Sequence, residues 1–249
     1  MRLLRRVDLY GLFGLLLLLI VWQTIGSLKL AGPSIPSLAD VWVVYREPWK
    51  LALLSRAAAS TLLSALIGLS AGCVLGTAVA VLAHLVAPLR RGLDQLSVIV
   101  NAVPAVALAP ILIVTVGRDW TPAMLAAIPV FFVIYITVSS GLRSASPRLM
   151  DVFRILGASR LTRLLFLEAP AALPALLGGM RISVTAAVVG AIVGEWFGAS
   201  TGLGIVILNT MLNFQTQLMW AAVLLAASAS LTAYGILGAC ENYVRRRFS

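Results

Sequence analysis

Six long apolar runs alternate along the chain with shorter polar segments. A helix of about 20 apolar residues has the length that crosses the hydrocarbon core of a bilayer. The pattern therefore predicts an all-α, polytopic membrane protein with six transmembrane helices in a single domain, 1–249. The expected spans are residues 9–28, 57–86, 96–116, 122–142, 173–197 and 218–240. Between the first two, a short amphipathic helix is expected at 37–45, with Ser37 as its N-cap.

Composition strengthens this prediction and excludes several classes of protein. Hydrophobic residues make up 61% of the chain and charged residues 11%, and the mean hydropathy is +1.01. Soluble domains carry about 25% charged residues, so no soluble core of this length could bury so many apolar side chains. The net charge is +10, yet no basic stripe is interleaved with exposed aromatic residues, so nucleic acid is not an expected partner.

The basic residues also predict the orientation in the membrane. Six spans place both termini on one side, together with the 87–95 loop and the 143–172 loop. Arginine is dense in these four segments, and cytoplasmic loops are the ones that carry excess Lys and Arg. Both termini and the 143–172 loop are therefore expected to be cytoplasmic. The opposite loops contain only Lys29, Arg46, Lys50, Arg56 and Arg118.

Two spans contain residues that modify an ordinary helix. Gly68, Gly72 and Gly76 recur every four residues and form a smooth face on which another backbone can approach closely. Packing within the chain and packing against a second copy both remain open for this face. In the third span Pro104 and Pro110 free backbone carbonyls and kink the helix. A distorted segment of this kind is a candidate for lining a transport path. Asn101, which lies beside it in the sequence, is a further candidate for this path.

Glu195 lies near the outer end of the fifth span and is followed by Trp196. A carboxylate at membrane depth is a functional candidate by default, here for a gate or a substrate passage. The favoured alternative is a structural carboxylate bonded to backbone N–H groups of the loop around Gly202 and Gly204. Trp196 fits the aromatic belt at a membrane surface.

Residues 147–170 are polar and punctuated although the chain around them is apolar. Ser146 and Pro147 form a helix start, Gly157 can supply a left-handed helix end, and Ser159 can cap a second helix. Two short helices are therefore expected, 147–156 and 160–167, with Pro170 and Pro174 ending the segment. The residues alone leave two interpretations: helices lying on lipid headgroups, or a projection that docks a cytoplasmic protein.

The same segment resembles the cytoplasmic signature of binding-protein-dependent ABC importer permeases. That signature is E-A-A, three residues, G, nine residues, and I-x-L-P. In this chain Asp151-Val152-Phe153 stands for E-A-A, the glycine is Gly157, and Leu167 precedes Ala169-Pro170. The run "LGASRLTRLLFLEAPAALPALLGGMRI" and the upstream "PAVALAPILIVTVG" are also similar to family patterns. The branch resembles nitrate, sulfonate and taurine permeases, with "AIVGEWFGASTGLGIVIL" closer to pyrimidine-precursor or riboflavin permeases.

The resemblance implies a translocation subunit in a bacterial inner membrane that moves a small polar organic solute inward by alternating access. It implies as partners two ATP-binding subunits, a second permease copy in a homodimer, an extracytoplasmic solute-binding protein and the lipid bilayer. The two short helices would be coupling helices received by the ATPase. The residues implied in this coupling are Asp151, Arg154, Gly157, Ala158, Ser159, Arg160 and Pro170.

Motifs that other functions require are missing from the sequence. A phosphate-binding P-loop needs Gly-Lys, but Lys29 follows Leu28 and Lys50 follows Trp49. His84 is the single histidine, expected as a packed or interfacial side chain, and no metal-ligand cluster is present. We therefore expect no catalytic residue, cofactor or metal. The rivals are a secondary transporter or channel, which would need intramembrane carboxylates, and an intramembrane enzyme.

Overall fold

The computed structural model describes residues 2–248, and this part of the chain is helical without a β-strand. Each long helix corresponds to one of the apolar runs, which confirms the predicted all-α membrane fold. The elements are α1 (Arg2–Ser27), the 3₁₀ turn Gly32–Ser34, α2 (Leu38–Arg46), α3 (Pro48–Leu85), α4 (Ala87–Ala102), α5 (Ala105–Val116), α6 (Thr121–Leu142), α7 (Pro147–Ile155), α8 (Arg160–Arg163), a π turn (Leu164–Glu168), α9 (Ala169–Glu195), α10 (Leu203–Leu212) and α11 (Thr216–Phe248).

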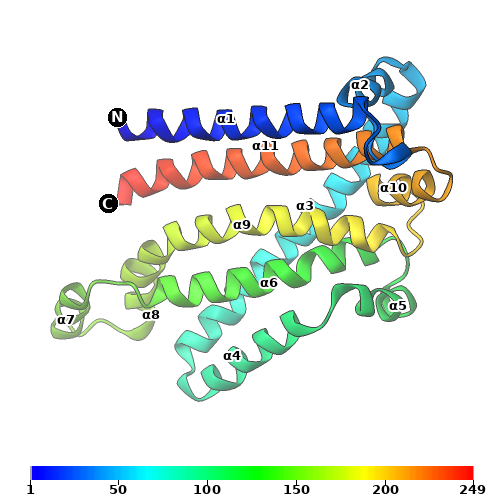
Figure 1. The fold of residues 1–249 in the computed structure, drawn as a ribbon. Helices are drawn as coiled ribbons and strands as arrows, with labels where there is room; N and C mark the ends of the chain where they lie inside the picture. Colours follow the sequence, from blue (N-terminus) through cyan, green and yellow to red (C-terminus); the bar gives the residue numbers. More distant parts are fainter. Residues whose placement is uncertain (1, 249) are drawn as a thin grey trace.

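Five helical stretches within residues 2–248 are long and apolar enough to cross a membrane singly, namely those in α1, α3, α6, α8–α9 and α11. A sixth crossing requires α4 and α5 together, which meet at an angle of 95°. α3 begins nine residues before the expected span, at Pro48, and has 38 residues. At 1.5 Å per residue it is about 57 Å long, well beyond the ~30 Å hydrocarbon core. Figure 1 shows α3 running obliquely behind α6 and α9.

The expected third span, 96–116, is distorted as predicted, and the distortion is a complete break between two helices. The helix that reaches this region starts at Ala87, stops at Ala102 and restarts at Ala105. Val103 between them is extended, with φ −74° and ψ 123°. The cause is Pro104, because a proline ring disfavours the helical conformation of the residue before it. Pro110, in contrast, lies inside α5 without ending it.

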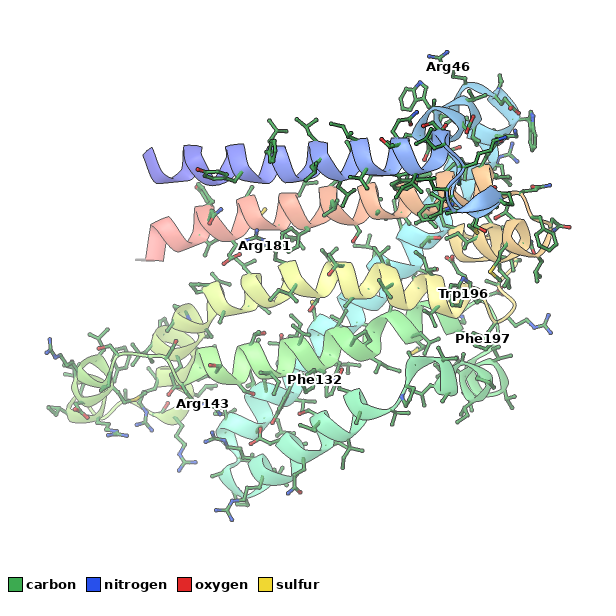
Figure 2. The ribbon with its side chains drawn as sticks, in the orientation of Figure 1. Arg46, Phe132, Arg143, Arg181, Trp196 and Phe197 are labelled. Carbon is green, nitrogen blue, oxygen red and sulfur yellow. The ribbon has the colours of Figure 1, made fainter. Side chains whose placement is uncertain are left out.

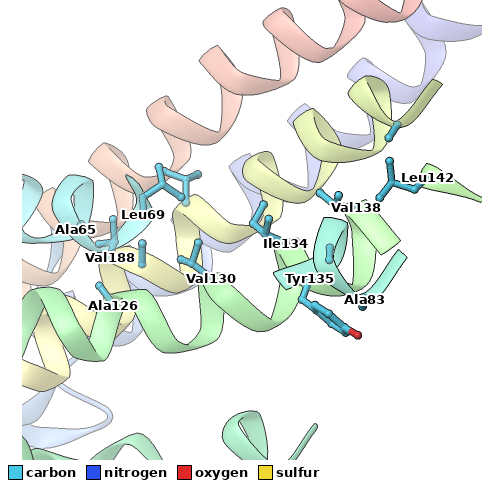
Figure 3. Packing of buried hydrophobic residues seen from close by; sticks show 14 of the residues in the cluster. Ala65, Leu69, Ala83, Ala126, Val130, Ile134, Tyr135, Val138, Leu142 and Val188 are labelled. Atoms are coloured by element: carbon cyan, nitrogen blue, oxygen red, sulfur yellow. The ribbon is translucent and has the colours of Figure 1, made fainter. Parts of the chain in front are cut away.

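α6 forms the centre of the bundle, with α3 on one side and α9 on the other (Figures 1 and 3). Its Val130, Ile134 and Tyr135 side chains are fully buried. They pack in one apolar cluster with residues of α3 and α9 such as Leu69 and Val188. The burial of α6 on two sides explains why its sequence is apolar all round rather than amphipathic.

The glycines of α3 serve packing within the chain. A Cβ atom on Gly68 would lie 2.5 Å from the Ala123 carbonyl oxygen, and one on Gly72 would lie 2.7 Å from Val130 Cβ. Gly76 approaches α6 in the same way, at 2.8 Å from the Phe131 carbonyl oxygen. The stripe is thus occupied by α6, and this contact leaves no room for a second copy on the same face.

A second apolar cluster closes the end of the bundle opposite α7 (Figure 1), which is called the outer end below, around α2, α10 and the first turns of α11. The predicted helix start at Ser37 is confirmed, because Ser37 Oγ accepts from the Asp40 N–H at 3.1 Å and Asp40 Oδ2 accepts from the Ser37 N–H. The Tyr45 hydroxyl donates to the Ala221 carbonyl at 2.6 Å. Burial raises the pKa of Tyr45, so its hydroxyl stays a donor at neutral pH.

The starting end of α1 and the final end of α11 lie at the end of the molecule from which α7 projects, with α2 and α10 at the other end (Figure 1). Figure 2 shows Arg143 near the first of these ends and Arg46 near the second. The segment between α6 and α9 and the two ends of the chain therefore share one side, as the number of spans requires.

Candidate functional site

The segment between α6 and α9 extends beyond the helical bundle (Figure 1). None of the residues of α7 is buried. Ile155 and Leu156 at its tip have 86% and 77% of their surface exposed. Large apolar side chains that project this far from their own core mark a surface that contacts something else, either protein or lipid.

Gly157 makes the turn between α7 and α8. Its φ is +70°, a left-handed conformation that costs residues with a side chain roughly 1 kcal/mol. The Gly157 N–H donates to the Arg154 carbonyl at 3.0 Å, and the Ala158 N–H donates to the Phe153 carbonyl at 2.9 Å. This pair of bonds is the Schellman arrangement that ends helices at a glycine. The expected left-handed conformation of Gly157 is confirmed, and the chain enters α8 three residues later, at Arg160.

Ser159 caps α8, as expected, because its Oγ accepts from the Thr162 N–H at 3.1 Å. Ser146 occupies the N-cap position of α7, but its side chain makes no capping bond.

The expectation that Pro170 and Pro174 end the segment is wrong. The helix runs on from Arg160 to Glu195, through a π turn at Leu164–Glu168. Pro170 lies in the first turn of α9, and Pro174 is accommodated inside it. The wider π turn lies directly before Pro170, where the missing N–H breaks the regular helical bonding. The second short helix is therefore the first part of a transmembrane helix, rigidly joined to it.

The polar residues of the segment divide between exposed and tethered positions. Asp151 and Arg154 form an exposed ion pair with each other at 3.3 Å. Such pairs contribute little to stability, so both side chains are available to a partner. Arg160 instead reaches across to the end of α3, where its Nη1 donates to the Leu85 carbonyl at 3.4 Å.

His84 and Glu168 form a link that the sequence does not predict. His84 Nε2 and Glu168 Oε2 are 2.8 Å apart, which joins the last turn of α3 to the π turn. The two residues are 84 positions apart in the chain. The packed environment expected for His84 is present, but its acidic partner emerges only from the fold.

Glu195 is 1% exposed at the outer end of α9. Its Oε2 accepts from the Gly204 N–H at 2.7 Å and from the Thr61 hydroxyl at 3.0 Å. A Cβ atom on Gly202 would overlap the Glu195 carboxyl group, so only glycine fits at that point of the loop. These contacts match the structural alternative: Glu195 ties the loop after α9 to α3 through its own bonds and through Thr61.

Replacing Glu195 with alanine should destabilise the protein by about 2–3 kcal/mol, because the buried Gly204 N–H loses its acceptor. Glu195→Gln should destabilise less than Glu195→Ala, since its amide oxygen can accept the same bond, although its NH2 group then takes the place of the unpaired Oε1. Thermal unfolding in detergent, followed by fluorescence size-exclusion chromatography, measures both. Equal melting temperatures for Glu195→Ala and wild type would contradict the structural role.

Polar residues line two of the cavities between the helices. An outer cavity of about 320 Å³ is bordered by Ser64, Asp119, Trp120 and the hydrogen-bonded pair Ser60–Thr201. An inner cavity of about 530 Å³ lies between α6, α9 and α11.

Arg181 on α9 lines the inner cavity and pairs with Glu241 of α11 at 3.2 Å; its guanidinium lies 4.3 Å from the centre of the Tyr234 ring. Figure 2 shows Arg181 in the space between α9 and α11. Arg181 thus lies inside α9 and within the fifth expected span, 173–197.

The remaining pathway candidates lie apart from one another. Asn101 and Pro104 are exposed at the break between α4 and α5, and Pro110 is exposed in α5. Trp196 lies directly after α9, is 42% exposed, and is seen with Phe197 in Figure 2. The structure therefore gathers the residues expected in coupling into one projection, except Pro170, which lies in α9, and it places the pathway candidates at the α4–α5 break, in α5 and directly after α9.

Comparison with known proteins identifies the class to which this fold and projection belong, the membrane permeases of importers. Residues 50–248 match the family described as binding-protein-dependent transport system inner membrane component, and the chain belongs to this family. A probable ABC transporter permease protein of Haemophilus influenzae is 32% identical over 87% of this chain and 89% of its own length. The formylaminopyrimidine transport permease protein ThiX of Halalkalibacterium halodurans is 28% identical over 91% of each chain.

Among solved structures, a chain of the MetNI methionine ABC transporter in an inward-facing conformation matches with a TM-score of 0.71. It is 20% identical and covers 80% of this chain and 99% of its own. At this identity the match shows the shared fold. The chain is thus a permease component of a binding-protein-dependent ABC importer.

Proposed function

We propose that the chain works as a homodimer with two copies of a separate ATP-binding subunit and receives its solute from an extracytoplasmic binding protein. The observation that carries this proposal is the exposed helix–glycine–helix projection Pro147–Arg163, whose tip presents Ile155 and Leu156. The missing P-loop lysine supports it as well, since this chain then depends on another for ATP work.

Coupling would operate through the rigid connection between the projection and the membrane helices. Asp151 and Arg154 would make polar contacts to the ATPase, and Gly157, Ala158 and Ser159 would hold the angle between the short helices. Movement of α8 would pass directly to α9, because one helical run joins them across Pro170. It would also pass to α3 through the Arg160–Leu85 and His84–Glu168 contacts.

The solute is proposed to be a small polar organic molecule moved inward by alternating access. Support comes from the family and from relatives such as the formylaminopyrimidine permease. The passage would run beside the broken helix at Asn101 and Pro104, with Pro110 and Trp196 towards its outer part. Glu195 would act indirectly, by fixing the loop that follows Trp196 and contributes Thr201 to the outer cavity.

The cytoplasmic location of both termini and of the projection is also proposed. The concentration of arginine on that side supports it. Single cysteines at Ser146 and at Ser200, labelled from outside intact cells by a membrane-impermeant maleimide, test it. Ser200 on the outer loop should react and Ser146 should not.

Purification from native membranes tests the proposed assembly. A tagged permease should recover a P-loop ATPase in a one-to-one ratio, and Ile155→Asp should remove it without lowering the amount of inserted permease. The physical reason is that a charge at the exposed apolar tip opposes burial in a partner groove. Arg148→Asp, on the same exposed helix, is the control for general charge effects.

Absence of any co-purifying ATPase, together with uptake that persists without ATP, would favour the stand-alone secondary transporter instead. A charge at Ile155 that leaves ATPase recovery unchanged would show that the tip is not the docking surface.

A further inference from the structure

A small cavity of about 240 Å³ lies between the projection and the end of α3. Its wall comes from four parts of the chain: the end of α3, the start of α4, α7 and the α8–π turn region. The lining residues are His84, Leu85, Ala87, Met150, Arg154, Arg160, Arg163 and Glu168. Three of these are arginines, an unusual density of positive charge around so small a volume.

The charges around the cavity do not cancel. Asp151 offsets Arg154 through the exposed ion pair at 3.3 Å, and Glu168 supplies the other carboxylate. Glu168 Oε2 is already in contact with His84 Nε2, while Arg160 contacts only the Leu85 carbonyl oxygen. Two arginines, Arg160 and Arg163, therefore stand against one carboxylate, which leaves a net positive charge.

Arg163 is the arginine of this cavity whose guanidinium group has no hydrogen-bond or ion-pair partner in the described part of the chain. It is half-buried. The start of α4 and the end of α3 meet on the cavity wall, so their opposite dipole ends offset each other and the arginine side chains supply the positive charge. Planar guanidinium groups bind phosphate oxygens with paired hydrogen bonds, which an ammonium cannot do.

The position of the cavity favours the phosphate of a lipid headgroup over a phosphate free in solution. It lies where α3 and α9 leave the apolar bundle, at the level of the exposed apolar side chains Val86, Leu165 and Phe166. Basic pockets between transmembrane helices at a membrane surface bind the headgroups of anionic lipids. A lipid can place its phosphate among the arginines while its acyl chains follow the apolar side chains nearby.

We propose that the cavity bordered by Arg154, Arg160 and Arg163 binds the phosphate of an anionic phospholipid, with Arg163 as its principal ligand. The bound lipid would contact the end of α3, α7 and α8 together, and would thereby stabilise the position of the projection relative to the membrane. This site rests on the proposed function only for the membrane orientation, which decides which leaflet supplies the lipid. The lipid site can therefore be disproved while the proposed assembly with the ATP-binding subunits stands, and the reverse also holds.

Native mass spectrometry of the purified complex tests the site. The complex is delipidated, then titrated with phosphatidylglycerol or with phosphatidylcholine, and the bound lipids are counted. Wild type should bind phosphatidylglycerol about tenfold more tightly than Arg163→Gln, which loses one charge-assisted contact. Arg148→Gln removes the same charge from an exposed position on α7 outside the cavity and should bind like wild type.

A second arm of the experiment identifies the source of the phosphate. Inorganic phosphate at millimolar concentration should not displace phosphatidylglycerol, because it lacks the acyl chains. Displacement by inorganic phosphate would overturn the lipid assignment in favour of a soluble anion. Equal loss of binding in Arg163→Gln and Arg148→Gln would overturn the site, since only general surface charge would then matter.

The third arm concerns a protein occupant. Loss of the ATP-binding subunit from Arg163→Gln, with unchanged phosphatidylglycerol binding, would assign the cavity to an acidic side chain of that subunit and overturn the proposal. Retention of the subunit together with weakened lipid binding supports it. Fluorescence size-exclusion profiles show that each variant is folded before it is compared.

Discussion

Replacing Gly157 with proline should reduce solute uptake to background while the permease remains inserted in the membrane. Proline fixes φ near −65°, whereas this position has φ +70°, and proline also removes the N–H that bonds the Arg154 carbonyl. The left-handed turn then cannot form, at a local cost of about 3 kcal/mol or more. The projection is exposed and contributes nothing to the core, so insertion and folding of the bundle should persist.

Gly157→Asn is the matched control, because asparagine adopts the left-handed conformation more readily than other residues with a side chain. No atom lies within 4 Å of the position that its Cβ would occupy. We expect its uptake to stay within about fivefold of wild type, the effect of roughly 1 kcal/mol. Uptake of the radiolabelled solute and ATPase co-purification are measured together. Full transport by Gly157→Pro would contradict the coupling role of the turn.

Replacing Gly72 with valine should prevent accumulation of folded permease. The new Cβ would lie 2.7 Å from Val130 Cβ and 2.8 Å from the Ala127 carbonyl oxygen, so α3 and α6 would have to separate. Separation disrupts the central cluster around Val130, at an expected cost of about 3 kcal/mol or more. The amount of monodisperse protein in detergent and its melting temperature measure the effect.

Gly235→Val serves as the control, because it adds the same side chain inside α11 where no atom lies within 4 Å. It should change the melting temperature little. If Gly72→Val accumulates normally and instead shifts the complex from dimer to monomer, the glycine stripe would be a face between copies after all.

The structure around Gly157 could be predicted from the sequence, whereas the helix that Gly72 contacts could not. At Gly157 the local pattern was sufficient, because the Ser159 cap, the apolar spacing and the glycine all act within a dozen residues. At Gly72 the spacing indicated a close helix contact but not the partner. The partner is α6, which becomes the central helix only when α3 and α9 pack on it from two sides.

Pro104 and Pro170 also differ in whether the local sequence alone explains the structure around them. Both were expected to interrupt helices, since a proline removes one backbone donor wherever it stands. Pro104 does so and divides the third span at an angle of 95°, while Pro170 is absorbed by a π turn. At Pro170 the helix is held in place by packing and by the Glu168–His84 contact, which supports the turn from outside its own backbone.

The sequence by itself determined the membrane class, the apolar helices, the side shared by the termini and the projection, and the short helix α7 with the left-handed turn at Gly157. These features follow from apolar length, charge distribution and local capping, which all act within one segment. Only the tertiary structure decided the partner of the glycine stripe, the His84–Glu168 link and the arginine-lined cavity. Each of these depends on contacts between helices far apart in the chain, and no local pattern specifies which helices meet.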